Sequence, residues 1–211
     1  VRHFIHRLGM WRRKLDVIIA FARQYPHLVD DATCEWLDLP SPVNYPKPDA
    51  KTNLWSALGR MLPKEAIDEK ADVYSHLTAQ RVIDVREDFA KAYNNRASKL
   101  PVHAEVRLAE HFHSNSLQFV ERIKYVGCSK PSCYCCSLYL RYHPGNFVLR
   151  PCHGNVWPRW NPPLMSAPKG SVEAKHNRDV LNKMIAHIRR DFFYQIDQLR
   201  SRTTNPPDSS S

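Results

Sequence analysis

The sequence predicts an α/β domain with a helical extension on its N-terminal side and a long helix on its C-terminal side. Apolar residues recur at helical spacing in several long segments. Two short β-branched or aromatic stretches separate some of them, so helix, strand, helix and strand alternate over residues 104–149. We expect an extension and linker over residues 1–62, the main domain over 63–200 and a disordered polar tail over 201–211.

The first 62 residues predict one helix and a linker. Residues 3–24 have an amphipathic pattern in which Arg12, Arg13 and Lys14 interrupt the apolar positions Ile5, Leu8, Trp11, Leu15, Ile18, Ile19 and Ala22. Residues 38–53 are predicted to be a loop, because this stretch contains Pro40, Pro42, Pro46 and Pro48.

The elements of the main domain follow in order. Residues 64–94 predict a helix, with Pro63 just before its start. A short apolar step leads into His103, and Glu105 then opens a predicted helix that reaches Phe119. Residues 122–127 are β-branched and aromatic and end in glycine, which is typical of a strand.

The second half of the domain repeats this alternation. Residues 133–142 predict a helix, entered after Pro131 and capped by Ser132. Residues 147–149 are a second strand candidate. An irregular loop is expected over 151–163, and a long helix over 172–200 has an apolar stripe formed by Leu181, Met184, Ile185, Ile188, Phe192, Ile196 and Leu199.

The charge of the chain favours a polyanionic partner. Lys and Arg number 31 against 21 Asp and Glu, a formal net charge of +10. Nucleic acid is the commonest partner of such chains, and a merely solvated basic surface is the alternative. No segment has the length of a membrane span and no signal peptide is recognisable, so we expect a cytoplasmic or nuclear protein without a membrane partner.

The six cysteines are clustered rather than spread along the chain. Five of them fall between Cys128 and Cys152, and Cys34 is the sixth. A disulfide framework is typical of short secreted chains, whereas clustering in a chain of 211 residues favours metal binding in a reducing compartment.

One imidazole, two thiolates and one carboxylate form the most informative pattern. Cys133 and Cys136 are three apart, so on a helix both sulfurs face one metal, whereas Cys135 points away and is expected to be a buried thiol. With His103 as third ligand, the fourth tetrahedral position of Zn²⁺ stays open for a hydroxide. Glu105 is near enough to move protons, and this order of residues is typical of zinc nucleobase deaminases.

A structural zinc site is the main alternative to a catalytic one. Cys128, Cys152 and His153 are available as a fourth protein ligand. A closed site has no use for Glu105, which favours the catalytic interpretation.

The chain resembles the zinc-dependent nucleic acid/nucleotide (cytidine) deaminase superfamily, and within it the OTT-type, largely fungal deaminase branch. The resemblance covers roughly residues 100–163 and rests on Val102–Glu105, Tyr125–Cys136, and Arg150–Gly154 followed by Trp160. It implies a zinc deaminase domain with a three-layer α/β/α cytidine-deaminase-like fold around a mixed sheet. It also implies zinc on His103, Cys133 and Cys136, with Glu105 as proton shuttle.

Two features depart from the common superfamily pattern. Ser132 stands between Pro131 and the first cysteine of the pair, a spacing that fits the branch. The β-hairpin that usually precedes the histidine is not readable upstream of Val102, so it is either hidden near residues 55–62 or displaced by helices.

A flipped or single-stranded base needs aromatic walls and phosphate contacts. The aromatic candidates are Tyr134, Tyr139, Tyr142, His143, His153, Trp157 and Trp160, and the cationic ones are Arg141, Arg150 and Arg159. Trp157 and Trp160 are equally explained as loop anchors that pack on the core. The residues we expect to bind substrate are Ser132, Tyr134, Arg150, His153, Trp157 and Trp160.

These patterns predict a hydrolytic zinc deaminase acting on a base in nucleic acid, most directly cytosine to uracil in single- or double-stranded DNA. A free cytidine or nucleotide deaminase, an RNA adenosine deaminase, an inactive deaminase-like scaffold and a non-catalytic zinc-stabilised nucleic-acid-binding module remain alternatives. The oligomeric state and the role of the N-terminal helices are not determined by these patterns.

Overall fold

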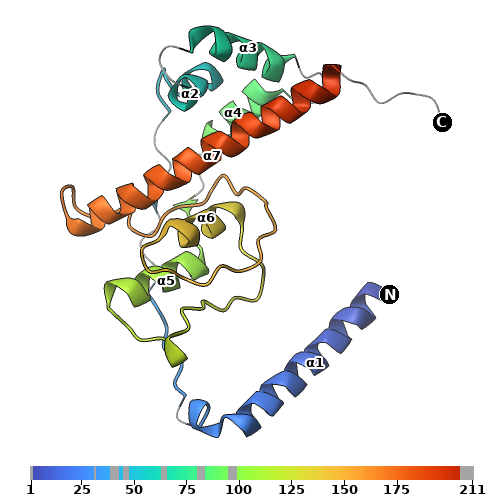
Figure 1. Ribbon diagram of the computed structural model, residues 1–211, viewed down its shortest axis with the longest axis vertical. Coiled ribbons are helices and arrows are strands. Elements are labelled where there is room, and N and C mark those ends of the chain that lie inside the picture. The colour runs from blue at the N-terminus through green and yellow to red at the C-terminus, as the bar shows by residue number, and fades with distance from the viewer. Residues whose placement is uncertain are drawn as a thin grey trace. The chain divides into compact units, whose positions relative to one another are not determined.

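Helices dominate the computed structural model, which describes residues 2–30, 32–38, 43–44, 48–62, 66–79, 84–94 and 99–204 (Figure 1). The chain divides into two compact units, Val1–Asp38 and Leu39–Ser211. The first unit contains α1 (Arg2–Gln24) and the 3₁₀ helix η1 (Pro26–Leu28), so the predicted N-terminal helix is confirmed. None of the described helices has an apolar stretch long enough to cross a membrane.

In its described residues, the second unit is built from six α-helices and very little strand. Its α-helices in the described residues are α2 (Leu54–Met61), α3 (Ile67–Thr78), α4 (Val85–Asn94), α5 (Ala104–Ser114), α6 (Tyr134–Tyr142) and α7 (Val172–Thr204). A 3₁₀ helix, η2, spans Val120–Arg122. The two strands, β1 (Val43–Asn44) and β2 (Lys99–Leu100), are antiparallel and pair Val43 with Leu100.

The predicted three-layer α/β/α fold with a mixed sheet is wrong for the described part of the chain. No strand forms at residues 122–127 or 147–149, although both segments were predicted to be strands. A single backbone hydrogen bond joins them, from the Val148 amide to the Lys124 carbonyl at 2.9 Å. Tyr125 and Val148 are about half exposed. A β-branched stretch forms a strand only when a neighbour pairs with its backbone through a ladder of hydrogen bonds. Among the described residues neither segment has such a ladder, because one bond is not enough.

Two further expectations about local structure are corrected. The helix predicted over 64–94 is two helices, α3 and α4, with residues 80–83 between them outside the described residues. Residues 55–62, where a hairpin was considered, lie mostly in α2, whose start is capped by Asn53 accepting from the Ser56 amide at 2.8 Å. The predicted helices at 133–142 and 172–200 are confirmed, and most of the predicted tail, 205–211, lies outside the described residues.

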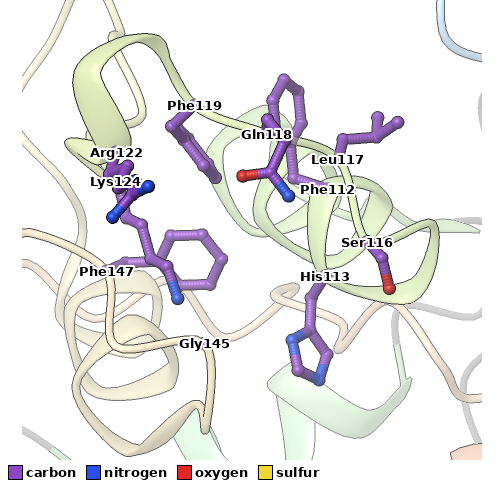
Figure 2. A pocket seen from close by; sticks show the side chains of 10 residues that line it. All are labelled: Phe112, His113, Ser116, Leu117, Gln118, Phe119, Arg122, Lys124, Gly145 and Phe147. Carbon is purple, nitrogen blue, oxygen red and sulfur yellow. The ribbon is translucent and has the colours of Figure 1, made fainter.

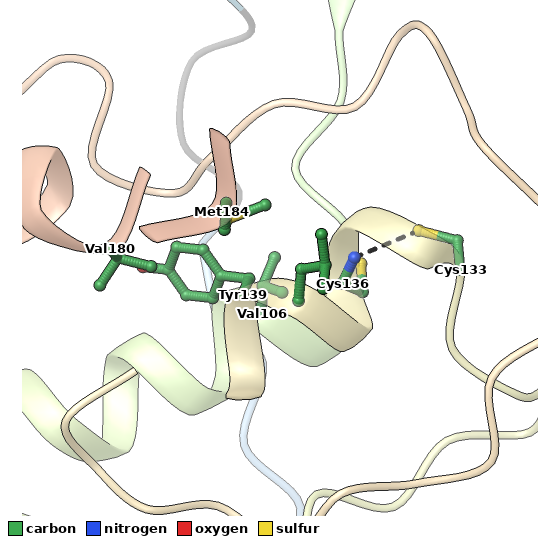
Figure 3. Close-up of a cluster of buried hydrophobic side chains, with 7 residues drawn as sticks. Val106, Cys133, Cys136, Tyr139, Val180 and Met184 are labelled. Carbon is green, nitrogen blue, oxygen red and sulfur yellow. Dashed lines mark hydrogen bonds between the residues drawn. The ribbon is translucent and has the colours of Figure 1, made fainter. Parts of the chain in front are cut away.

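α7 connects two hydrophobic clusters within the second unit (Figure 1). One cluster joins α5, α6 and α7 through Val106, Cys136, Tyr139, Val180 and Met184 (Figure 3). The other joins α2, α3 and α7 through Leu58, Val73 and Ile196. Because the first cluster includes the sulfur-bearing face of α6, burial of apolar surface fixes the position of Cys136.

A buried carboxylate also links α5, α6 and α7. Oε2 of Glu110 accepts hydrogen bonds from the Tyr139 hydroxyl at 2.8 Å, from Nε2 of His143 at 3.0 Å and from Nε2 of His176 at 3.3 Å. Burial opposes ionisation of Glu110, but the bonds from His143 and Tyr139 outweigh it and lower the pKa of the carboxyl to about 2. Glu110 is therefore a charged polar centre of an otherwise apolar core.

Three histidines lie near this carboxylate, and the distances between their nitrogens would allow them to bind one metal ion. They are His113, His143 and His176, with ligand atoms within 4.8 Å of one another. The Gly145 amide donates to Nδ1 of His143 at 2.9 Å, which leaves Nε2 of that ring as the donor to Glu110. Neither nitrogen of His143 keeps a lone pair for a metal, and we interpret the cluster as a hydrogen-bonded core.

Candidate metal centre

The predicted ligands lie at the first residues of two helices. His103 is the N-cap residue of α5 and Cys133 is the N-cap residue of α6, both with extended backbone. Cys136 lies one turn into α6 and is completely buried. Helix N-termini favour negative charge, so this placement stabilises thiolates.

The loop after residue 149 holds the two helix starts in place. Val102 forms an isolated parallel bridge with Asn161, and Ser132 forms another with Cys152. The Tyr134 amide, at the start of α6, donates to the carbonyl of Asn155 at 3.1 Å. One loop thus contacts the backbone beside both ligand sets.

The three ligand atoms have the spacing of a tetrahedral zinc site. Nδ1 of His103 lies 3.5 Å from Sγ of Cys133 and 3.3 Å from Sγ of Cys136. With metal bonds of about 2.3 Å to sulfur and about 2.0 Å to nitrogen, tetrahedral angles give N···S edges of about 3.5 Å. All three ligand atoms lie within 4.8 Å of one another, so this set can hold a zinc ion.

The two thiols differ in acidity. The Cys136 thiol and its backbone N–H donate to Sγ of Cys133, and against the cost of burial they lower the pKa of Cys133 to about 6. The same contact and burial raise the pKa of Cys136. Figure 3 shows the backbone bond from Cys136 to Cys133, which orients the first sulfur.

Trp160 supplies an additional contact to the second sulfur. Its indole Nε1 donates to Sγ of Cys136 at 3.2 Å, and this bond partly offsets the causes that raise the pKa of that thiol. Partners of this kind orient metal ligands and tune their basicity. The half-buried Trp160 ring also packs against the cluster of α5, α6 and α7.

The other cysteines near the site lie outside the ligand set. Cys135 packs against the core, and burial raises the pKa of its thiol to about 11. Cys128, Cys152 and His153, the possible fourth ligands, are described residues and lie outside the group formed by His103, Cys133 and Cys136. The sulfur of Cys152 accepts from the Gly154 amide at 3.3 Å. Among the described residues the set therefore supplies three protein ligands, one fewer than would close a tetrahedral zinc site.

Glu105 and two of the three ligands, His103 and Cys133, border one cavity of about 370 Å³, and Cys136 is buried outside its lining. Its lining includes His103, Glu105, Cys133, His153 and Trp157, together with Cys128, Ser129, Lys130 and Pro131. A neighbouring cavity of about 460 Å³ is bordered by His103 and Trp157 as well, and by Lys91 and Arg159. Glu105 thus borders the same cavity as His103 and Cys133.

The structure separates the six predicted substrate-binding residues into two groups. His153 and Trp157 border the metal cavity and are exposed. Ser132 is buried behind it, Trp160 bonds to Cys136, and the Tyr134 hydroxyl donates to Asp191 of α7 at 2.5 Å. Burial and the bond to Asp191 raise the pKa of Tyr134. A substrate role for these six residues stays a prediction.

Arg150, the last of the six, bridges two backbone carbonyls. Its Nη2 donates to the carbonyl of Cys128 at 2.9 Å and to that of Lys130 at 2.7 Å. This fixes the segment 128–130, which borders the cavity. In this position the guanidinium shapes the cavity wall.

Sequence reasoning missed the contribution of Ser129 and Lys130 to the cavity, and the bond from Trp160 to Cys136. The position of Lys130 just before Pro131 was visible in the sequence, but nothing local indicated that it borders the same space as Glu105. The contact of Trp160 depends on how the loop folds back over α6.

A comparison with protein-family models matches residues 102–164 to the OTT_1508_deam-like deaminase family. The matched segment contains His103, Glu105, Cys133, Cys136 and Trp160, so this part of the chain is similar to a deaminase family. Searches of curated proteins and of solved structures found no match.

Proposed function

We propose that this deaminase-family chain is a zinc-dependent hydrolytic deaminase that acts on a nucleobase in nucleic acid, with cytosine in DNA as the first candidate. The observation that carries the proposal is a three-ligand set of which two members, His103 and Cys133, border one cavity together with Glu105. A purely structural zinc site is closed by a fourth protein ligand and does not require Glu105.

The residues have separable roles in this proposal. His103, Cys133 and Cys136 hold the metal, and bound zinc supplies Lewis acidity and lowers the pKa of water to near neutrality. Glu105 accepts a proton from the attacking water and delivers protons to the ring nitrogen and the departing amine. His153 and Trp157 form the wall against which the base lies.

A polymeric substrate is supported by charge and by the adjoining cavity. The formal net charge is +10, and exposed Lys130 and Arg159 lie at the two cavities that share Trp157. A free nucleoside fills one cavity and needs no such extension, whereas a strand continues beyond the target base.

The test combines metal analysis with deamination assays on the full chain. Zinc content is measured first, and the loaded protein is then incubated with single- and double-stranded DNA and RNA. Sequencing for C-to-T and A-to-G changes identifies the base, and Glu105→Gln is the matched control. The proposal expects one zinc per chain in both proteins, with changes only in the parent. Loss of Glu105 should reduce the rate by about 10²–10⁴-fold.

Other outcomes identify the alternatives. Turnover of cytidine without any change in polymers supports a free-nucleotide enzyme. A-to-G changes confined to RNA indicate an adenosine deaminase. Stoichiometric zinc and nucleic-acid binding without turnover of any substrate indicate a non-catalytic binding module and contradict the proposal.

A further inference from the structure

A separate cavity of about 360 Å³ lies at the C-terminal end of α5 and shares no lining residue with the metal cavity (Figure 2). Three phenylalanines, Phe112, Phe119 and Phe147, form much of its wall. Arg122 and Lys124 border it on the side of Phe119 and Phe147 in Figure 2, and His113 and Ser116 border it on the other.

The aromatic wall combines two partly exposed rings with a third that belongs to a buried core cluster. Phe112 and Phe119 are half-buried, with ring centroids 4.5 Å apart and planes inclined by 42°. Phe147, behind them, is buried and meets Phe119 edge-on at 6.0 Å. Partly exposed aromatic rings that are held in place by further packing are surfaces on which nucleobases stack, whatever the base.

The cations at the rim are available for a ligand. Arg122 and Lys124 are exposed, and among the described residues neither has a carboxylate within salt-bridge distance. Two consecutive residues, Glu121 and Arg122, have φ of 51° and 62°, in the left-handed region. Non-glycine residues adopt this conformation at a cost and concentrate at functional sites.

One chain segment borders this cavity and the metal cavity. Arg122 and Lys124 line the first, and Cys128 and Lys130 line the second. The four-residue step from Lys124 to Cys128 spans at most about 14 Å. Both ends are fixed, since the Lys124 carbonyl accepts from Val148 and the Cys128 carbonyl accepts from Arg150. A few nucleotides of an extended strand cover this distance.

We propose that this cavity binds one nucleotide of the single strand whose target base occupies the metal cavity. The base lies against Phe119, and Arg122 and Lys124 contact the phosphates beside it. Lys130 contacts the backbone between the two sites. The proposal rests on the proposed function for the target base, but the binding of the flanking nucleotide is measurable without turnover.

The charge contacts are tested with oligothymidylate of about 12 nucleotides, which contains neither cytosine nor adenine. The double variant Arg122→Gln/Lys124→Gln is compared with Arg178→Gln/Lys183→Gln, which removes the same charge from exposed positions of α7 that line neither cavity. Binding is followed by fluorescence anisotropy over a range of salt. The first variant should bind more weakly, and the negative slope of log association constant against log salt should become shallower by about 1.4. The control variant should keep the slope of the parent.

The stacking contact is tested by removing one base at a time. Abasic substitutions are scanned on either side of a fixed target base, with the full-length protein and with Phe119→Leu. The parent should lose about 5–150-fold in affinity at one position a few nucleotides from the target. Phe119→Leu, which keeps an apolar side chain, should bind all abasic oligonucleotides alike.

The outcomes separate this inference from the proposed function. Equal salt slopes for the two double variants, with a flat abasic scan, overturn the flanking site even if the protein deaminates polymers. Failure of deamination on every polymer contradicts the proposed function, and a position-specific abasic effect then still supports the nucleotide site. Because the Gln variants change exposed residues, their test stands even if Phe119→Leu fails to fold.

Discussion

The indole nitrogen of Trp160 lies 3.2 Å from the sulfur of Cys136 and donates a hydrogen bond to it across 24 positions of sequence. The contact gives the loop over residues 151–163 a direct role at the candidate metal centre. Among the described residues, the sulfur of Cys136 also lies within 3.3 Å of Nδ1 of His103. Trp160 is therefore a partner of the ligand set rather than a wall of the cavity.

Replacing Trp160 by Phe should weaken zinc binding. The variant keeps the aromatic packing against the core but loses the N–H that donates to Cys136. Removing such a partner lowers metal affinity by about 10–100-fold. Competition with a chromogenic chelator measures the change, and Trp157→Phe is the control because, in the described part of the chain, Trp157 forms no hydrogen bond to a ligand. Equal zinc affinities for the two variants would contradict the role given to Trp160.

The three clustered cysteines of α6 should differ in their effect on metal content. Cys133→Ser and Cys136→Ser each remove a ligand and should yield protein with little zinc after dialysis. Cys135→Ser should retain one zinc, because its sulfur packs against the core and lies outside the ligand group. Elemental analysis of the three purified variants distinguishes them. Loss of zinc from Cys135→Ser alone would show that the ligand assignment is wrong.

Arg150→Lys should loosen the cavity wall without releasing the metal. The lysine retains the charge but cannot reproduce the planar guanidinium that bridges the carbonyls of Cys128 and Lys130. The free energy of local opening at residues 128–130 should fall by about 1–3 kcal/mol. Hydrogen exchange without nucleic acid measures this, with Arg141→Lys, an exposed position, as control. Unchanged exchange, with weaker nucleic-acid binding, would instead support a phosphate contact for Arg150.

Glu110 should make the stability of the fold depend on pH in the acid range. Its folded pKa of about 2 lies below the ordinary value of 4.5, so its contribution is fully present above pH 4.5 and is lost as the pH falls toward 2. Glu110→Gln should lower the free energy of unfolding by about 1–3 kcal/mol at pH 7. Its melting temperature should then decline less steeply than that of the parent between pH 5 and pH 2. Glu69→Gln, at an exposed position of α3, serves as control because it should keep the parent's slope.

Part of this protein was predictable from local sequence. The helices over α1, α6 and α7 follow from apolar periodicity, which is a property of neighbouring residues. The convergence of Cys133 and Cys136 follows from their spacing of three on a helix. His103, thirty positions earlier, was placed with them by the order of the motif.

Tertiary structure decided the rest, because the remaining features depend on residues far apart in sequence. The segments at 122–127 and 147–149 have strand composition, but no neighbour pairs with them among the described residues, and helix packing forms the core in place of a sheet. Trp160 reaches Cys136, Tyr134 reaches Asp191, and Arg150 reaches Cys128 through folded loops and helix contacts. The sequence by itself indicated which side chains can hold a metal ion and that Glu105 follows the histidine by two positions. Only the packing of α5, α6 and the following loop determined that His103, Glu105 and Cys133 border one cavity, since periodicity and spacing carry no information about non-local contacts.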